Sequence, residues 1–340
     1  MKRLRIVALV HHELVPPAQA PPEELVSAPW RAEYDVVQCL AGLGHEVRVL
    51  GVGGELNPLR RAVRDHRPHL FFNLLEGFDD VVHWEQNIVG YLEMSKMKYT
   101  GCNSRGLLLA RDKALTKKLL AFHRVRVAEF ALARRGRTFR RSPKLGFPLF
   151  VKSLSVDASI GISQASVVEG DEKLQERIRF VHDSVGTDAL VESYIEGREL
   201  NVGILGNERL KALPIWELVF DNMPESARKI ATERLKWSAS YQAKHGIRSG
   251  PAVELTPAQA SRIQEIGRRV YRALYLSGYA RIDLRLTAGG EVYVVEANPN
   301  AQIARGEDFA DAAEAAGIGY GALLQRIVNL GLAWEPLAAG

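Results

Sequence analysis

Asp283, Glu296 and Asn298 could together hold a divalent cation, because Mg²⁺ prefers oxygen ligands and usually takes one or two carboxylates together with substrate phosphates. They lie in the segment ARIDLRLTAGGEVYVVEANPN, residues 280–300. Two carboxylates that face each other across paired strands repel, so a positive group is needed beside them. Arg281 and a divalent cation are both candidates for that group. A hairpin whose polar face simply meets water is the alternative interpretation.

The spacing within this segment predicts the hairpin that would bring the acids together. Its first half alternates apolar and polar residues, and its second half is rich in Val and Tyr, as is typical of two β-strands. The glycine pair 289–290 fits a two-residue turn. In that register Asp283 lies opposite Glu296, Arg281 lies opposite Asn298, and all four side chains share one face. A three-residue loop would shift the pairing by one residue.

A lysine and a loop of small residues form a second candidate site, which would suit phosphate groups. Lys152 ends the apolar stretch LFVK, and residues 153–161 follow as a small-residue loop that includes Ser159 and Gly161. Small residues let backbone N–H groups approach phosphate oxygens, and the lysine adds a positive charge. A lysine that merely ends an exposed strand is the alternative.

Lys113 is a second basic candidate for contacting phosphate. It lies in the amphipathic segment 104–123, which predicts one long helix with Ser104 as its N-cap. A solvated helix face is the alternative, since Lys117 and Lys118 follow on the same helix.

Two carboxylates in the segment ALVESYIEGREL (189–200) could contact the rest of a nucleotide. Glu192 follows an apolar strand, and Glu199 follows a turn at Gly197. Carboxylates at these positions could bind an amino group or ribose hydroxyls. They could equally be surface residues at the end of a loop.

The first predicted strand ends on His11, His12 and Glu13. These residues are candidates for contacting a small-molecule substrate, because open α/β sheets bind ligands at the carboxyl ends of their strands; a surface turn is the alternative. The apolar run before them is too short for a signal peptide, and no run approaches the 18 residues of a membrane span. We therefore expect a cytoplasmic protein without a membrane partner.

The bulk composition is that of an ordinary globular protein. The chain has 340 residues, a net charge of +5 and two cysteines, which excludes a disulfide framework and a cysteine-rich zinc site. The densest basic stretch, residues 134–144, is interpreted as a solvated surface, with a phosphate or nucleic-acid patch as the alternative. We expect no nucleic-acid partner, because a nucleic-acid binder more often shows a continuous basic stripe.

The elements that must position these residues fall into two kinds. Residues 4–77 follow a βαβαβ order, which predicts a parallel sheet of Rossmann-like type. No GxGxxG motif accompanies it, so dinucleotide binding is not expected. Residues 199–220 have the pattern of successive antiparallel strands. Thr256 and Gln259 form a predicted capping box at the start of a later helix.

In combination and order, these motifs resemble the ATP-grasp superfamily, specifically its D-alanine–D-alanine ligase-like branch. The segments that carry the resemblance are YTGCNSRGLLLARDKALTKKLL (99–120), LFVKSLSVDASIGIS (149–163), LVESYIEGRELNVGIL (190–205), ERLKW (233–237) and YARIDLRL followed by VYVVEANPN (279–300). The resemblance covers about residues 1–330, and the last segment is the most specific.

The resemblance implies a fold and a domain division. The fold class is α/β, with α+β architecture in the ATP-grasp portion. An N-terminal Rossmann-like domain (1–103) is expected to precede a central ATP-grasp subdomain (104–195) and a C-terminal ATP-grasp subdomain (196–340) that carries the metal site.

The resemblance also implies ATP as a cofactor and gives roles to the candidate nucleotide contacts. Lys113 and Lys152 match the lysines that contact the ATP phosphates and the adenine side, and Ser159 lies in the matching phosphate loop. Glu199 matches the carboxylate that binds the ribose. The positions that match the adenine-binding hinge are Glu192, Ser193, Tyr194 and Ile195.

The metal and catalytic positions are implied in the same way. Asp283, Glu296 and Asn298 match the ligands of two Mg²⁺ ions, with Mn²⁺ as an alternative metal. Arg281 matches the arginine that stabilises the developing negative charge on the acyl group. Lys236 matches a position in the mobile loop that closes over the phosphates.

The sequence departs from the family pattern in the half that would bind substrate. The glycine-rich N-terminal motif is absent, Ala158 stands where the family has a serine, and Trp237 stands where it has a tyrosine. After EANP the family commonly has PG, whereas this chain has Asn300 to Gln302. Asn300 is therefore a substrate candidate, and we expect substrates other than D-alanine.

The expected activity is that of an ATP-dependent carboxylate–amine ligase that forms an amide or peptide bond through an acylphosphate. Its partners would be a small carboxylate and a small amine, and a homodimer is conceivable because relatives often dimerise. An ATP-grasp kinase and a non-catalytic nucleotide-binding regulator are the alternatives.

Overall fold

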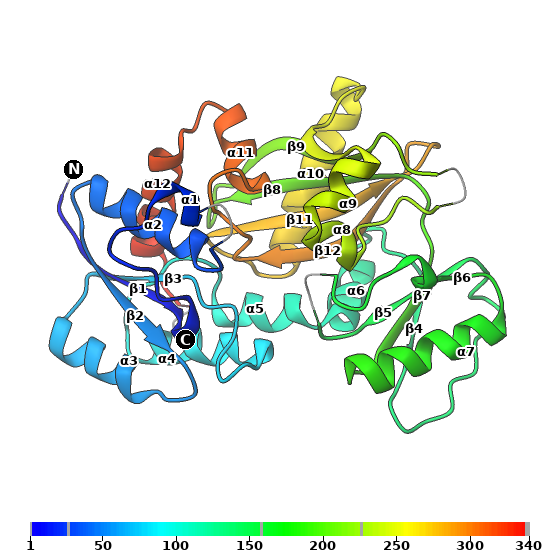
Figure 1. The fold of residues 1–340 in the computed structure, drawn as a ribbon, viewed down its shortest axis with the longest axis horizontal. Coiled ribbons are helices and arrows are strands. Elements are labelled where there is room, and N and C mark those ends of the chain that lie inside the picture. Colours follow the sequence, from blue (N-terminus) through cyan, green and yellow to red (C-terminus); the bar gives the residue numbers. More distant parts are fainter. Residues whose placement is uncertain (1, 26–27, 157–158, 225–226, 337–340) are drawn as a thin grey trace.

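The computed structural model describes residues 2–25, 28–156, 159–224 and 227–336 of the chain. Its named strands form three sheets, with a three-stranded sheet at one end of the molecule, a four-stranded sheet at the other and a five-stranded sheet between them (Figure 1). The first sheet is parallel and the other two are antiparallel. This confirms the predicted fold class.

The N-terminal sheet has the strand order β2-β1-β3. Strands β1 (Arg5–His11), β2 (Glu46–Val52) and β3 (Leu70–Asn73) are the three strands predicted from the βαβαβ pattern. Helix α2 (Arg31–Gly42) packs on this sheet together with α12 (Tyr320–Ala333), the last helix of the chain, through a shared apolar cluster. The end of the chain therefore returns to the N-terminal sheet (Figure 1).

The four-stranded sheet has the order β4-β7-β5-β6. Its strands are β4 (Phe130–Ala133), β7 (Ala189–Ser193), β5 (Leu149–Ser153) and β6 (Val167–Val168). Helix α7 (Asp171–Phe180) packs its apolar side onto this sheet. Because β5 and β7 are neighbours, two of the predicted nucleotide contacts lie on adjacent strands.

The five-stranded sheet has the order β10-β9-β8-β11-β12. Its strands are β10 (Ile247–Pro251), β9 (Lys211–Phe220), β8 (Arg198–Leu205), β11 (Tyr279–Leu286) and β12 (Val292–Pro299). Helix α10 covers one face of this sheet (Figure 1). The opposite face carries the polar residues of the predicted metal site.

Helix α10 (Pro257–Ala273) begins as predicted. Thr256 is its N-cap, and the side chains of Thr256 and Gln259 form the reciprocal bonds of a capping box. Ile263 and Val270, which keep helical spacing, are buried in the cluster that joins the helix to the sheet. The apolar stripe of this helix therefore forms a large part of the core behind the site.

The long helix predicted over residues 104–123 is two helices. Helix α5 (Ser104–Arg111) ends where Asp112 adopts an extended backbone, and α6 (Lys113–Phe122) begins directly after it. The Asp112 side chain accepts hydrogen bonds from the first N–H groups of α6, so it caps a new helix. The predicted Ser104 cap is also wrong, because the N-cap of α5 is Asn103.

The remaining helical segments are short. They are α1 (Pro22–Leu25), α3 (Asn57–Arg61), α4 (Glu85–Met94), α8 (Glu233–Trp237), α9 (Ala239–His245), α11 (Asp308–Ala315), and five single-turn segments at 12–14, 62–66, 82–84, 164–166 and 181–185. Within the described residues, no helix has the length and apolar character needed to cross a membrane.

The β11–β12 hairpin has the predicted register across its polar face. Asp283 lies opposite Glu296, and Arg281 lies opposite Asn298. Their side chains project from the same face of the hairpin, because residues two apart on a strand point the same way. The pairing predicted from the sequence is confirmed.

The turn of this hairpin is not the predicted one. A backbone hydrogen bond from Thr287 to Glu291 leaves residues 288–290 as a three-residue loop. That loop would shift the whole pairing by one residue, but a β-bulge follows next to Asp283, where Val295 is the extra residue on β12. The bulge cancels the shift, so the acids still face each other.

Candidate functional site

The polar face of the hairpin holds Asp283 in a network of charge-assisted hydrogen bonds. Arg281 donates from Nε to Asp283 Oδ1 at 2.7 Å and from Nη2 to Oδ2 at 2.9 Å. Asn298 donates its side-chain amide to Oδ2 at 2.9 Å. The nearby Asp283 charge raises the pKa of the Arg281 guanidinium, so this arginine stays positively charged.

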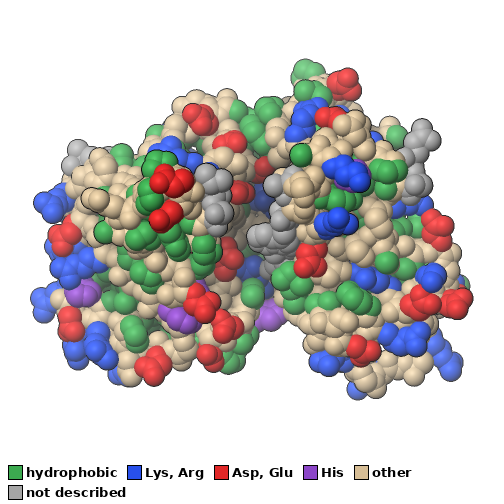
Figure 2. Space-filling view, viewed as in Figure 1, with side chains coloured by type: hydrophobic (Ala, Val, Ile, Leu, Met, Phe, Trp, Pro, Cys, Tyr) green, Lys and Arg blue, Asp and Glu red, His purple; other side chains and the backbone are tan. Residues whose placement is uncertain are grey.

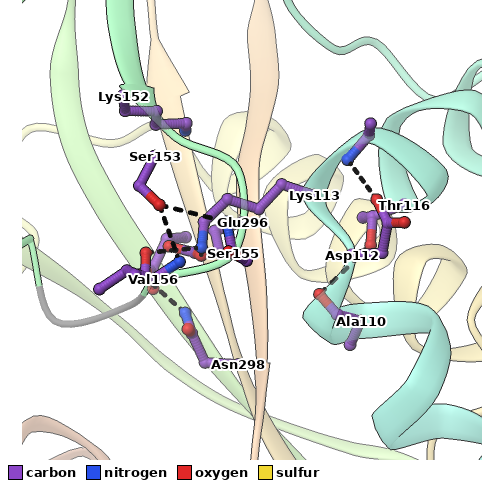
Figure 3. Close-up of polar contacts among 12 residues, drawn as sticks. Ala110, Asp112, Lys113, Thr116, Lys152, Ser153, Ser155, Val156, Glu296 and Asn298 are labelled. Atoms are coloured by element: carbon purple, nitrogen blue, oxygen red, sulfur yellow. Dashed lines mark hydrogen bonds and ion pairs between the residues drawn. The ribbon is translucent and has the colours of Figure 1, made fainter. Parts of the chain in front are cut away.

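Lys113 joins the start of α6 to the other acid of the hairpin. Its Nζ lies 3.1 Å from Glu296 Oε1 and donates to the backbone carbonyl of Val156 at 3.0 Å (Figure 3). The positive end of the helix dipole adds to the lysine charge at this point. A positive group therefore does lie beside the paired carboxylates, and it comes from a distant segment of the chain.

Glu192 lies between two lysines in the interior. Its carboxylate oxygens are 2.8 Å from Lys117 Nζ and 3.0 Å from Lys152 Nζ, and all three side chains are buried. Burial alone would raise the pKa of Glu192, but the two lysines outweigh it and hold the pKa at about 2. Burial lowers the pKa of Lys117, with Glu192 opposing that shift.

Sequence reasoning missed Lys117. The alternative for Lys113 was a solvated helix face shared with Lys117 and Lys118, whereas the structure buries Lys113 and Lys117 and exposes Lys118. The signal that could have found Lys117 is its spacing of four residues from Lys113, because such residues lie on one face of a helix. The solvated-face interpretation of Lys113 is therefore wrong.

Arg285 is a second residue that the sequence analysis left without a role. It donates to Glu199 Oε2 at 2.8 Å and to the backbone carbonyls of Ile195 at 3.2 Å and Lys229 at 2.8 Å. Its guanidinium also lies against the ring of Tyr194. Arg285 therefore fixes the hinge segment predicted to hold the adenine and ribose.

The loop after β5 bends back on its own strand. Ser153 Oγ accepts hydrogen bonds from the N–H groups of Ser155 at 3.2 Å and Val156 at 3.0 Å (Figure 3). Ser159 has a left-handed backbone with φ of 59°. Ala158, the position at which the sequence departs from the family, lies outside the described residues.

The candidate Lys236 lies on α8, which is attached to this same loop. Glu233, the first residue of α8, accepts a hydrogen bond from Gly161 N at 2.7 Å and donates its own N–H to Ile162 O at 3.0 Å. The side chains of Lys236 and Trp237 lie outside the described atoms. The attachment nevertheless brings the Lys236 backbone position next to the predicted phosphate loop.

Of the three substrate candidates at the end of β1, His11 contacts neighbouring residues. His11 Nε2 lies 3.3 Å from Asp80 Oδ1, and His11 Nδ1 accepts a weak hydrogen bond from Glu13 N at 3.4 Å. The side chains of His12 and Glu13 are exposed. Their ligand role stays a prediction.

The Asn300 side chain forms hydrogen bonds to two distant segments of the chain. Its Oδ1 accepts from Cys102 N at 2.7 Å, and its Nδ2 donates to Glu85 Oε1 at 2.8 Å. Glu85 is buried and also pairs with Arg111 at 2.5 Å, and its burial raises its pKa. Asn300 therefore holds the loop after β12 against the first residue of α4 and the segment that precedes α5.

The donor set of the hairpin fits Mg²⁺ only together with further oxygen ligands. Among the described residues, no group of three His, Cys, Asp or Glu side chains is arranged to hold a metal ion. Asp283, Glu296 and the Asn298 carbonyl oxygen supply two carboxylates and one amide. That number suits an ion that completes its coordination with phosphate oxygens and water.

These groups come from neighbouring helices and strands. Figure 2 shows a depression between the N-terminal part of the chain and the part that carries α8 and α9, with acidic side chains beside it. The lysines come from α6 and β5, and the acids and Arg281 come from β11 and β12. The arrangement can bind a polyanion with its metal and can stabilise a negative charge that develops beside Arg281.

Comparisons with known proteins match most of the chain. The family model described as "D-ala D-ala ligase C-terminus" matches residues 115–329. The "Uncharacterized protein y4sG" of Sinorhizobium fredii is 30% identical over 89% of this chain and 88% of its own length. A D-alanine–D-alanine ligase of Desulforudis audaxviator is 30% identical over 88% of this chain and 92% of its own.

The solved structures point to the same fold. The structure of a D-alanine–D-alanine ligase from Bacillus anthracis complexed with ATP has a TM-score of 0.72 and 21% sequence identity to this chain, and the match covers 97% of both chains.

Proposed function

The chain belongs to the D-alanine–D-alanine ligase family of ATP-grasp ligases, and from this premise we propose that it joins a carboxylate to an amine through an acylphosphate, with substrates other than two D-alanine molecules. It is an ADP-forming, ATP-using ligase that makes carbon–nitrogen bonds. The observation that carries the proposal is the hairpin face on which Arg281, Asp283, Glu296 and Asn298 meet Lys113.

The chemistry follows from the weakness of a carboxylate as an electrophile. Transfer of the ATP γ-phosphoryl group to the carboxylate creates an acylphosphate, whose leaving group is phosphate. The amine then attacks the acyl carbon and forms a tetrahedral oxyanion, which collapses to the amide and releases phosphate. Phosphoryl transfer depends mainly on positioning and on neutralising the charge of the phosphates.

Different residues of this chain bind the phosphates, orient the nucleoside and stabilise the oxyanion. Lys113 and Lys152 place positive charge beside the phosphates, and the hinge held by Arg285 and Glu199 orients the nucleoside. Arg281 faces the position where the oxyanion develops. Mg²⁺ held by Asp283, Glu296 and Asn298 would supply further charge neutralisation at the phosphate oxygens.

The expectation of substrates other than D-alanine rests on the loop after β12. Where the family commonly has PG, this chain has Asn300 to Gln302, and the Asn300 side chain bonds to Cys102 and Glu85. A loop held in this way presents different groups to a substrate than a glycine backbone does.

The test is a screen of amino acids, dipeptides and small carboxylates for ADP release with ATP and Mg²⁺, followed by mass spectrometry of the product. A ligase consumes an amine and releases ADP and phosphate. Glu296→Gln should lower turnover by about a hundredfold or more, while Glu314→Gln, at an exposed position on α11, should leave it unchanged. Full turnover in Glu296→Gln would contradict the proposed site.

A further inference from the structure

Arg177, on the inner side of α7, is a buried cation that pairs with no carboxylate among the described residues. Its side chain is 7% exposed, and its guanidinium carbon lies 4.3 Å from the centre of the Phe180 ring. Within the same residues its Nε has no hydrogen-bond partner. Burial lowers the pKa of the guanidinium. A buried charge without a counter-ion costs free energy, so the position of Arg177 requires an explanation.

The bonds of this guanidinium go to the end of the predicted phosphate loop. Arg177 Nη2 donates to the backbone carbonyl of Gly161 and, at 2.7 Å, to Ser166 Oγ. Ser166 Oγ also accepts from Ser163 N at 3.1 Å. One buried side chain therefore fastens both sides of residues 159–166 (the loop end) to α7.

Gly161 has a backbone that suits no other residue. Its φ of 73° lies in the left-handed region, and a Cβ at this position would lie 2.9 Å from Val185 Cγ2. While its carbonyl accepts from Arg177, its N–H donates to Glu233 Oε2 at 2.7 Å. Gly161 therefore connects α7 to α8, although Arg177 and Glu233 belong to segments far apart in the sequence.

Further hydrogen bonds hold the segment 228–233 on the loop end. The N–H of Glu233 donates to Ile162 O at 3.0 Å. The side chain of Gln164 donates to Arg228 O at 2.9 Å and accepts from Arg228 N at 2.9 Å. Helix α8, with the backbone position of Lys236, is therefore docked on a loop end that Arg177 itself holds in place.

We propose that Arg177 and Glu233 are positioning residues that together hold α8 against the loop end through Gly161. Arg177 fixes the Gly161 backbone at its carbonyl, and the N–H of the same residue then meets the Glu233 carboxylate. The importance of this contact for catalysis rests on the proposed function, because an acylphosphate survives only where water is excluded. A docked α8 would keep water from the predicted phosphate loop.

Trypsin digestion of the full chain tests the contact without any substrate. The trypsin sites in and beside α8 are Arg228, Lys229, Arg234 and Lys236. Cleavage at these sites should be about fivefold faster or more in Arg177→Met and in Glu233→Ala, because α8 opens more often. Arg179→Met, at an exposed position on α7, should be cut at the rate of the unaltered chain. Glu233→Gln should restore most of the protection, since its amide oxygen still accepts from Gly161 N.

The double variant Arg177→Met/Glu233→Ala distinguishes joint action from two independent effects. Because both residues act through Gly161, the double variant should be cut at most about twofold faster than the faster single variant. Effects that multiply, or cleavage of either single variant at the unaltered rate, would overturn the proposal. Urea unfolding shows whether each variant is folded. If Arg177→Met does not fold, Glu233→Ala decides the proposal alone, and its cleavage at the unaltered rate overturns it.

Once turnover is found, the ratio of ADP released to amide formed tests the role in catalysis. The unaltered chain should release one ADP for each amide. In Arg177→Met and Glu233→Ala the ratio should rise about twofold or more, because water reaches the acylphosphate. A smaller amount of folded enzyme would lower both products equally, so an unchanged ratio would overturn the catalytic role. If the unaltered chain releases no ADP with any substrate pair, the ligase proposal fails, while the digestion still decides the contact.

Discussion

Lys117 and Glu192 form a buried ion pair, with 2.8 Å between Lys117 Nζ and Glu192 Oε2. The pair joins α6 to β7, and Lys152 of β5 completes it from the other side. Removing one partner of a buried pair leaves an uncompensated charge, which is strongly destabilising. The three residues therefore join α6 to the four-stranded sheet and place two positive charges beside the predicted hinge segment.

Lys117→Met tests this relationship. The variant should lose about 3 kcal/mol of stability, because Glu192 keeps only one of its two lysines. It should also bind ATP about tenfold more weakly, because a positive charge is lost beside the hinge. Urea unfolding and nucleotide titration measure the two effects.

The matched control for that experiment is Lys118→Met on the same helix. Lys118 is exposed, so its loss should change stability by no more than about 0.5 kcal/mol. Equal effects in the two variants would mean that the buried pair has no special role.

Arg285→Lys should weaken nucleotide binding while leaving the fold intact. The guanidinium donates to Glu199 and to the carbonyls of Ile195 and Lys229 at once, and a lysine has neither the fork geometry nor the number of donors to replace it. We expect the KM for ATP to rise about tenfold, with a smaller change in kcat.

The comparison variant is Arg262→Lys, at an exposed position on α10. Steady-state kinetics at varied ATP should show no change in it. An unaltered KM for ATP in Arg285→Lys would show that this arginine does not fix the hinge for nucleotide binding.

Asp283→Asn tests the metal assignment. The substitution keeps the shape of the side chain but removes one of the two carboxylates that face each other, so the Mg²⁺ concentration that gives half-maximal activity should rise about tenfold or more. Chelation with EDTA should abolish activity in the unaltered chain, and added Mg²⁺ should restore it. Activity that is indifferent to EDTA would exclude the metal role of this face.

The stability of the chain should fall as the pH rises through the titration of Glu33. Its pKa is raised from 4.5 in the unfolded chain to about 7 in the folded one, so the folded state holds the proton more tightly. The stabilising effect of that proton is complete below pH 4.5 and is lost between pH 4.5 and 7. The cost at pH 8 is on the order of 3 kcal/mol.

Glu33→Gln should remove this dependence. The variant should be more stable than the unaltered chain at pH 8 and closer to it at pH 5, as measured by urea unfolding in the absence of ligand. If the difference between the two chains does not depend on pH, the carboxyl of Glu33 does not titrate in this range.

Several features of the site could be predicted from local sequence. Alternation placed Arg281, Asp283 and Arg285 on one face of a strand, and the capping box at Thr256 marked the start of α10. Strand alternation and helix caps depend on residues only a few positions apart, so they can be identified from the sequence without knowing the tertiary structure.

The sequence by itself determined the types of the elements and the residues that share each face, because strand and helix geometry are local. Tertiary structure decided which faces are buried and which charges from distant segments meet. The bulge at Val295 restores the pairing of Asp283 with Glu296, and Lys117 of α6 is buried against Glu192 of the distant strand β7. Contacts of that kind depend on how sheets and helices are stacked, and no spacing within one segment specifies them.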